Sequence, residues 1–311
     1  MNHGSTPVTI RDVGLRDGLQ ILPRTVPTAH KLQWLRAAHA AGLREMEVGS
    51  FVPPARLPQM ADTGEVVAAA LALPGLVVSV LVPNLKGAQA AIASGAHSML
   101  LPLSASHAHS LANLRKTPDE VVDEIARIRA LRDASGSACR IEVGLSTAFG
   151  CTIQGRVDEA EVLRLVRAAL AAGAEHVSLA DTVGYADPLH VQLLFERCLD
   201  AVGDRLSCGH FHDTRGLGLA NVYAAWQAGV RRFDACVGGI GGCPHAPGAS
   251  GNVATEDVAW LFAGMGVSTG LDVDALLALR EAIGRDWLPG EALHGHVWRA
   301  GLPKTLRAEL A

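Results

Sequence analysis

The sequence lacks the features that mark several large classes of protein. None of its six cysteines forms a Cys-x-x-Cys pair, and the six are spread along 311 residues, which argues against a disulfide framework or a zinc knuckle. No stretch of about eighteen apolar residues is long enough to cross a bilayer. Residues 1–7 lack the cationic and apolar regions of a signal peptide. We therefore expect a cytoplasmic protein with no membrane partner.

The chain also lacks a large excess of positive or negative charge. The net charge is −4, and no basic run with interleaved aromatic residues occurs, so a nucleic-acid partner is not expected. Hydrophobic residues make up 49% of the chain and charged residues 19%, which is typical of a globular protein with a large buried interior. A chain of this length can form a single α/β barrel, because such barrels often use 250 residues or more.

Short β-branched runs alternate with longer segments rich in alanine and leucine. The candidate strands lie near residues 8–15, 45–51, 77–83, 98–104, 140–147, 176–182, 207–212 and 232–238. Helix-length segments follow near residues 28–41, 60–73, 86–95, 118–133, 158–172, 188–202, 216–228 and 254–265. Eight strand–helix units predict a parallel sheet closed into a (β/α)8 TIM barrel.

An open, doubly wound sheet is the structural alternative. It is disfavoured because no Gly-x-Gly-x-x-Gly follows the first candidate strand. Beyond about residue 266 the pattern loosens into one or two helices and a tail with proline and glycine. We expect a catalytic barrel over residues 1–270 and a short C-terminal helical extension with a tail over residues 271–311.

His210 and His212 are spaced as metal ligands on a strand, because residues i and i+2 project from the same face. A pair of solvent-facing histidines would have the same spacing. Polar residues also follow the other candidate strands, and barrel enzymes place their reacting groups at those strand ends. An unpaired buried charge costs roughly several kcal/mol of folding free energy. A large number of ionisable groups at one edge of the barrel therefore indicates a bound cation.

Asp17 is the natural carboxylate partner of the two histidines, and Asn252 can add a carbonyl oxygen. Arg16, beside that carboxylate, suits stabilisation of an enolate or carbonyl oxygen. Each residue also has an ordinary structural interpretation. Asp17 can be a turn or capping residue, Asn252 can be the N-cap of the helix that enters near Ala254, and Arg16 can be a surface residue.

Cys243 lies in a glycine-rich loop, Val237-Gly-Gly-Ile-Gly-Gly-Cys-Pro244, whose composition is typical of a mobile lid. A thiol there can donate or accept a proton. The alternative is an inert, small apolar side chain, which is what we expect of the other five cysteines.

Six segments of the chain together resemble the 3-hydroxy-3-methylglutaryl-CoA lyase family, within the wider group of metal-dependent lyases, aldolases and Claisen-condensing barrels. The segments are Gly14–Gln20, Glu47–Phe51, Pro83–Gly87, Leu179–Gly184, His210–Thr214 and Gly238–Asn252. The resemblance spans about residues 8 to 270, in order and with spacing that suits a barrel.

The resemblance implies roles for individual residues. A magnesium or manganese ion would be held by Asp17, His210, His212 and Asn252. Arg16 would polarise the thioester carbonyl, and Cys243 would be the lid thiol. On the substrate side, the residues implied besides Arg16 are Gln20, Glu47, with a supporting role, and Asp181. The catalytic group would thus comprise Arg16, Asp17, His210 and Cys243, with Asp17 and His210 both candidates for the general base.

The implied activity is cleavage of a 3-hydroxy-3-alkylglutaryl-CoA, above all 3-hydroxy-3-methylglutaryl-CoA, to acetyl-CoA and a ketoacid such as acetoacetate. The partner would be an acyl-CoA thioester, and the protein a homo-oligomer, either a dimer or a tetramer. The alternatives are a lyase for a related 3-hydroxyacyl-CoA, a sibling ketoacid aldolase or Claisen synthase, and a metal-binding barrel without catalytic activity.

The sequence departs from the family after the fourth candidate strand. The family usually has a glutamate, an aromatic residue and a second asparagine there, and this chain has His107, His109 and Arg115. The tail also repeats the His-x-His spacing at His294 and His296, away from any barrel strand, where a structural role is expected. We therefore expect the preferred acyl group to differ from, or to be broader than, 3-hydroxy-3-methylglutaryl.

Overall fold

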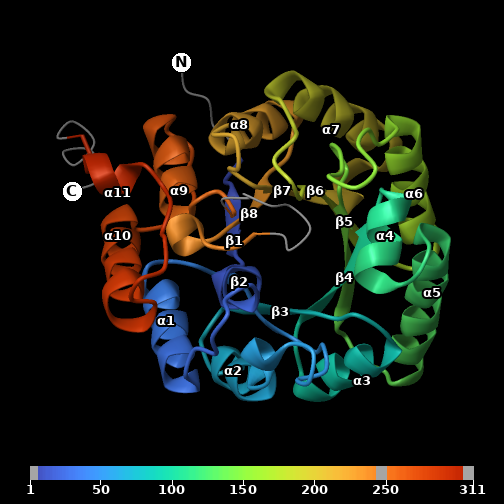
Figure 1. Cartoon of the computed structure of the whole chain (residues 1–311), viewed down its shortest axis with the longest axis horizontal. Helices are drawn as coiled ribbons and strands as arrows, with labels where there is room; N and C mark the ends of the chain where they lie inside the picture. Colours follow the sequence, from blue (N-terminus) through green and yellow to red (C-terminus); the bar gives the residue numbers. More distant parts are fainter. Residues whose placement is uncertain (1–5, 243–250, 304–311) are drawn as a thin grey trace.

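The computed structural model describes residues 6–242 and 251–303. Eight parallel strands close into a barrel in sequence order, which confirms the predicted TIM barrel (Figure 1). The strands are β1 (Thr9–Asp12), β2 (Glu45–Ser50), β3 (Val77–Leu81), β4 (Ser98–Ser104), β5 (Arg140–Ser146), β6 (His176–Asp181), β7 (Leu206–Phe211) and β8 (Arg232–Ala235).

Helices surround the barrel (Figure 1). Those that follow the strands are α1 (Thr28–Ala40), α2 (Thr63–Leu71), α3 (Leu85–Ser94), α4 (His107–Leu114), α5 (Pro118–Ala134), α6 (Glu159–Ala171), α7 (Pro188–Val202), α8 (Gly218–Ala228) and α9 (Thr255–Gly264). After α9 the chain continues with α10 (Val273–Ala282) and the single-turn α11 (Val297–Ala300). No helix in the described part of the chain is long and apolar enough to span a bilayer.

Alternate residues of each strand face the surrounding helices and the barrel interior. In β5, Ile141, Val143 and Leu145 are completely buried in the hydrophobic core. The intervening Glu142 reaches across the interior to Arg11 on β1, and Gly144 lines a cavity at the carboxyl ends of the strands. The two-residue period of a strand thus separates a packing face from a chemical face.

Charged side chains occupy part of the interior, where barrels usually carry branched aliphatic residues. Arg11 contacts Asp234 at 2.7 Å and Glu142 at 3.0 Å. Arg232 contacts the same carboxylate of Glu142 at 3.0 Å and Glu45 at 2.6 Å. Each charge in this interior network therefore has a partner of opposite sign, which offsets the cost of its burial.

Two local differences from the predicted elements affect the site. The first strand ends at Asp12, and the chain then forms a one-turn π-helix, η1 (Gly14–Gly18), in which Asp17 N–H donates to Val13 O at 2.7 Å. The segment between the fourth candidate strand and the helix predicted near residues 118–133 contains a helix that was not predicted, α4. Its N-cap, Ser106, accepts from the backbone N–H of His109 at 3.1 Å, so a single polar side chain begins a helix too short to show a clear periodicity.

The C-terminal segment packs against the barrel wall beside α1 and α9. His294 N–H donates to Gly238 O at 2.7 Å, and Asp257 accepts from the N–H groups of His296 and Val297. The backbone of His294 thereby fixes the tail to the beginning of the glycine-rich loop, and the backbone of His296 fixes it to α9.

Candidate active site

Three of the four predicted metal ligands lie together at the carboxyl ends of the strands. Asp17 comes from η1, His210 from the end of β7, and His212 from two residues further along. One ligand atom from each residue can be chosen so that all three lie within 4.8 Å of one another. The Nε2 atoms of the two imidazoles are only 3.1 Å apart, and His212 Nε2 is 4.0 Å from Asp17 Oδ2. A shared cation would satisfy nitrogen lone pairs that face each other so closely.

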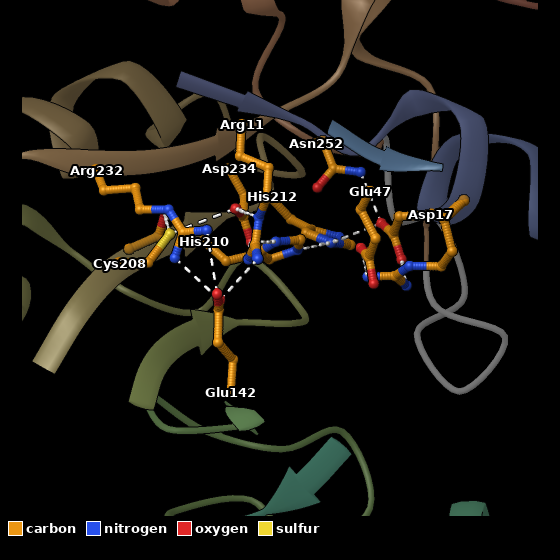
Figure 2. Close-up of polar contacts among 12 residues, drawn as sticks. Arg11, Asp17, Glu47, Glu142, Cys208, His210, His212, Arg232, Asp234 and Asn252 are labelled. Carbon is orange, nitrogen blue, oxygen red and sulfur yellow. Dashed lines mark hydrogen bonds and ion pairs between the residues drawn. The ribbon is translucent and has the colours of Figure 1, made fainter. Parts of the chain in front are cut away.

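Asp234 orients His210 from the other side. His210 Nδ1 lies 3.2 Å from Asp234 Oδ2, and Arg11 holds the same carboxylate (Figure 2). Burial alone would lower the pKa of His210, but the hydrogen bond and the charge of Asp234 outweigh it, so this pKa is raised. A proton held on Nδ1 by the carboxylate leaves Nε2 as a free lone pair, which is the usual arrangement of a metal-binding histidine.

Replacing Asp234 with asparagine should weaken binding of Mn²⁺ by about 10- to 100-fold, because the partner that orients His210 loses its charge. Calorimetric titration of the cation-free protein with Mn²⁺ measures this effect. Glu45→Gln is the matched control, since Glu45 belongs to the same interior network but contacts Arg232. Unchanged Mn²⁺ affinity in Asp234→Asn would restrict Asp234 to pairing with Arg11.

The other two ligands are also in the protonation states that bind a cation. Burial and the neighbouring His210 lower the pKa of His212 to about 4, so its ring is neutral at neutral pH. Burial would raise the pKa of Asp17, but Arg16 and the two histidines lower it, and the carboxylate is therefore ionised. With a cation bound in place of the Nε2 proton of His210, the set would supply two nitrogen lone pairs and one anionic oxygen.

Asn252 completes the set. Its amide Nδ2 donates to Asp17 Oδ2 at 2.7 Å and to Ile240 O at 3.1 Å, and its buried Oδ1 has no hydrogen-bond partner among residues 6–242 and 251–303. A buried carbonyl oxygen without a partner is costly unless a donor or a cation satisfies it. The N-cap of α9 is Ala254, so Asn252 does not cap that helix. The residues present therefore fit a divalent cation.

Arg16 is buried between two carboxylates and is not a surface residue. Its Nη1 lies 2.5 Å from Asp17 Oδ1, and its Nη2 lies 2.5 Å from Glu47 Oε2. Arg16 lines the cavity, and its buried Nε has no hydrogen-bond partner in the described part of the chain. Glu47, completely buried, supports Arg16 and does not itself line the cavity. Gln20 lines the cavity and donates to Asp17 Oδ1 at 2.9 Å.

One predicted site residue in the described part of the chain, Asp181, is not brought to the cluster. The carboxylate of Asp181 accepts from the backbone N–H groups of Tyr185 and Ala186, at 2.8 and 3.1 Å, and so organises its own loop. Its neighbours Ala180 and Thr182 line the cavity, and Asp181 does not. Cys243 lies outside the described residues.

The cavity above the cluster has a volume of about 580 Å³, within the usual range for a small-molecule site. Asp17, His210 and His212 form part of one wall, and α4 contributes to another. Asp234, His109 and Lys116 also line the cavity and were not among the predicted site residues. His109 is buried, with Nδ1 3.0 Å from Ser104 Oγ. The sequence signal that could have identified His109 as a site residue is its position shortly after the end of a strand, where barrel enzymes place functional groups.

Comparison with known proteins agrees with this geometry. The sequence model of the HMGL-like family matches residues 7–283. The (R)-citramalyl-CoA lyase of Chloroflexus aurantiacus is 39% identical, over 94% of this chain and 95% of its own length. The 3-hydroxy-3-isohexenylglutaryl-CoA/hydroxymethylglutaryl-CoA lyase of Pseudomonas aeruginosa is 39% identical, over 87% of this chain and 89% of its own.

A solved structure is similar over nearly the whole chain. It is an HMG-CoA lyase from Acinetobacter baumannii in complex with coenzyme A and 3-methylmalate, with a TM-score of 0.91, 37% identity and coverage of 98% of both chains. These relatives are all named as lyases, which argues against a metal-binding barrel without catalytic activity. The predicted resemblance is thus confirmed, and the chain belongs to the HMGL-like family and is a carbon–carbon lyase.

Proposed function

We propose that this protein cleaves a 3-hydroxy-3-alkylglutaryl-CoA, 3-hydroxy-3-methylglutaryl-CoA foremost, to acetyl-CoA and a ketoacid, acetoacetate in that case. The observation that carries the proposal is the cluster of Asp17, His210 and His212, with the unpartnered Oδ1 of Asn252, at the wall of a cavity that Arg16 also lines. Such a site suits a substrate that offers a hydroxyl and a carbonyl oxygen side by side.

Asp17, His210, His212 and Asn252 would hold the cation, magnesium or manganese. When bound, the cation would act as a Lewis acid that lowers the pKa of the substrate hydroxyl. The carboxylate of Asp17 and the amide oxygen of Asn252 are ligands that suit these hard ions. Manganese also accepts imidazole ligands such as His210 and His212.

The protein side chains would then move protons and stabilise charge. The hydroxyl proton passes to a base, Asp17 or His210, and the bond between C2 and C3 breaks to give the ketoacid and the enolate of acetyl-CoA. Arg16 has an unpartnered Nε–H donor with which to stabilise the enolate oxygen. A proton donor then converts the enolate to acetyl-CoA, and Cys243 is the proposed donor. Glu47 keeps Arg16 in place, and Gln20 keeps Asp17 in place.

Cys243→Ser should lower kcat by about 10²-fold, because a weaker acid replaces the thiol in a proton-transfer step. Mn²⁺ affinity should stay unchanged, since Cys243 is not among the proposed ligands. Steady-state assays and Mn²⁺ titration measure the two quantities. Cys139→Ser is a useful control, because this thiol is buried away from the site. An unchanged kcat in Cys243→Ser would assign Cys243 to packing.

A second candidate substrate is citramalyl-CoA. Its cleavage by the same chemistry would give acetyl-CoA and pyruvate. The observation that favours it is the extent of the similarity to the Chloroflexus lyase, which covers 94% of this chain, compared with 87% for the Pseudomonas lyase.

The decisive experiment is incubation of the purified protein with a mixture of acyl-CoA thioesters, with Mg²⁺ or Mn²⁺, followed by mass spectrometry. We expect depletion of a 3-hydroxy-3-alkylglutaryl-CoA and formation of acetyl-CoA. Depletion of citramalyl-CoA alone would select the second candidate. Absence of cleavage with either ion would refute both.

Three broader expectations remain proposals. We place the boundary between the barrel and the C-terminal extension near residue 270, just before α10. The cytoplasmic location and a homo-oligomeric state, dimer or tetramer, stay predictions.

A further inference from the structure

The wall of the cavity formed by β4, β5 and β6 carries unusually small side chains. Gly144 of β5 and Ser178 of β6 are register partners, and Ala180 of β6 is the register partner of His210. These three residues and Leu100 of β4 all line the cavity. We call this part of the wall, Leu100, Gly144, Ser178 and Ala180, the Gly144 recess. The recess begins at Ala180, beside the proposed metal ligand His210, and extends from β6 across β5 to β4.

Gly144 is not required by the backbone. Its φ lies outside the left-handed region, and it sits inside a regular strand in which a side chain would be accepted. A Cβ added there would lie 3.6 Å from Leu100 Cδ1 and 3.7 Å from Ser178 Oγ, which are ordinary van der Waals distances. Glycine inside a strand weakens it, because it packs no side chain and restricts a more flexible backbone. The consequence of glycine at this position is therefore space at the cavity wall.

The recess presents an apolar surface at its β4 end. Leu100 is buried but, unlike Met99 and Leu101 on the same strand, it does not belong to the hydrophobic core cluster. Leu81 of β3 also lines the cavity, on the side of the barrel opposite His210. An apolar group placed against Leu81 and Leu100 would be removed from water without displacing any charged partner.

The geometry of the proposed substrate directs its branch towards this wall. C3 is tetrahedral and carries the hydroxyl, the thioester arm, the carboxylate arm and the alkyl branch. In the proposed chemistry the hydroxyl on C3 lies at Asp17 and His210. The other three groups on C3 therefore point away from β1 and β7. Charged groups prefer the polar side of the cavity, since an unpaired carboxylate against Leu81 and Leu100 would be costly. The alkyl branch is the group that suits the apolar recess.

We propose that the Gly144 recess holds the alkyl branch on C3 and that Gly144 makes the protein accept branches of several carbons. The inference rests on the proposed function, because it takes the cleaved thioester to be a 3-hydroxy-3-alkylglutaryl-CoA. It adds the substrate class, thioesters with a long apolar branch on C3, and the residue that determines the accepted length.

The test compares 3-hydroxy-3-isohexenylglutaryl-CoA with 3-hydroxy-3-methylglutaryl-CoA in wild type and in Gly144→Leu. The wild type should cleave both, with kcat/KM values within about tenfold of each other. Gly144→Leu should lose about 10- to 200-fold in kcat/KM for the isohexenyl thioester, since lost apolar contacts and steric conflict in a pocket have effects of this size. It should lose less than about threefold for the methyl thioester.

Two controls separate the recess from general damage. Leu100→Ala enlarges the recess and should shift the ratio of the two kcat/KM values in the opposite direction, towards the isohexenyl thioester. Gly64→Leu adds the same side chain on α2, where no atom lies within 4 Å of the new Cβ, and should leave both values unchanged. Thermal unfolding of Gly144→Leu should resemble that of wild type.

A binding measurement keeps the recess testable if the proposed function fails. Calorimetric titration of the chelator-treated protein with each thioester gives dissociation constants without turnover. Selective weakening of isohexenyl binding in Gly144→Leu supports the recess, even where no cleavage occurs with Mg²⁺ or Mn²⁺. Equal weakening for both thioesters would place the carboxylate arm there, and unchanged binding would place the branch elsewhere, so both results overturn the proposal. Absence of cleavage in wild type counts against the proposed function alone.

Discussion

Replacing His210 with alanine is expected to lower kcat/KM by about 10³-fold or more, and to lower the amount of bound divalent cation with it. A cation in such a site stabilises the transition state by roughly several kcal/mol. Each increment of about 1.4 kcal/mol of stabilisation corresponds to a factor of ten in rate. Asp234 also orients His210, so removal of this imidazole leaves the buried carboxylate with Arg11 and the Cys208 thiol as its remaining partners. The loss of kcat/KM and the loss of bound cation should therefore occur in the same variant.

Elemental analysis and steady-state assays on the same preparations measure the two effects. Chelator-treated wild type should show the same loss of rate, and Mg²⁺ or Mn²⁺ should restore wild type but not His210→Ala. His296→Ala is the matched control, because this side chain is 70% exposed and belongs to the second His-x-His pair. Full turnover by chelator-treated protein would rule out the metal-dependent mechanism.

Replacing Arg16 with methionine is expected to lower kcat by about 10²- to 10³-fold, the usual cost of removing a donor that stabilises developing negative charge. The change should also destabilise the fold by about 3–5 kcal/mol, because it leaves the completely buried Glu47 without its cationic partner. Arg16→Lys should recover most of the stability and little of the rate, since a single ammonium does not reproduce the two contacts and the free Nε–H.

Chemical denaturation and kinetic assays separate these two effects. Arg24→Met serves as the control, because Arg24 is partly exposed and pairs with Glu291 at the surface, at 3.4 Å. A variant Arg16→Met that unfolds like wild type and retains its kcat would contradict the role of Arg16 both in the fold and in catalysis.

The barrel could be predicted from the sequence because its signals are local. Each strand is a short apolar run and each crossover helix a longer one, and an alternation repeated eight times fits few architectures. The helix predicted near residues 118–133 is present as α5, and a capping box of Thr117 and Glu120 stands at its start. The helix α4 was missed because its formation depends on one N-cap and on the burial of His109 and Ser110.

The cluster of candidate metal ligands could also be predicted, since the carboxyl ends of all strands in a barrel meet at one edge. That rule brings Asp17, His210, His212 and Asn252 together without any knowledge of their contacts. It does not tell which way a side chain at a strand end points. Asp181 satisfies the same rule, yet its carboxylate is used by the N–H groups of its own loop.

The sequence by itself thus determined the fold, the family and the types of ligand at the strand ends. Only the tertiary structure decided that Asp234 orients His210, that Arg16 joins Asp17 to Glu47, and that Gly144 leaves a recess in the opposite wall. The network behind these contacts joins residues far apart in the sequence, such as Arg11 and Asp234, which are 223 positions apart. They depend on the register between strands and on which face each residue presents, and a closed barrel fixes both only when all eight strands are in place.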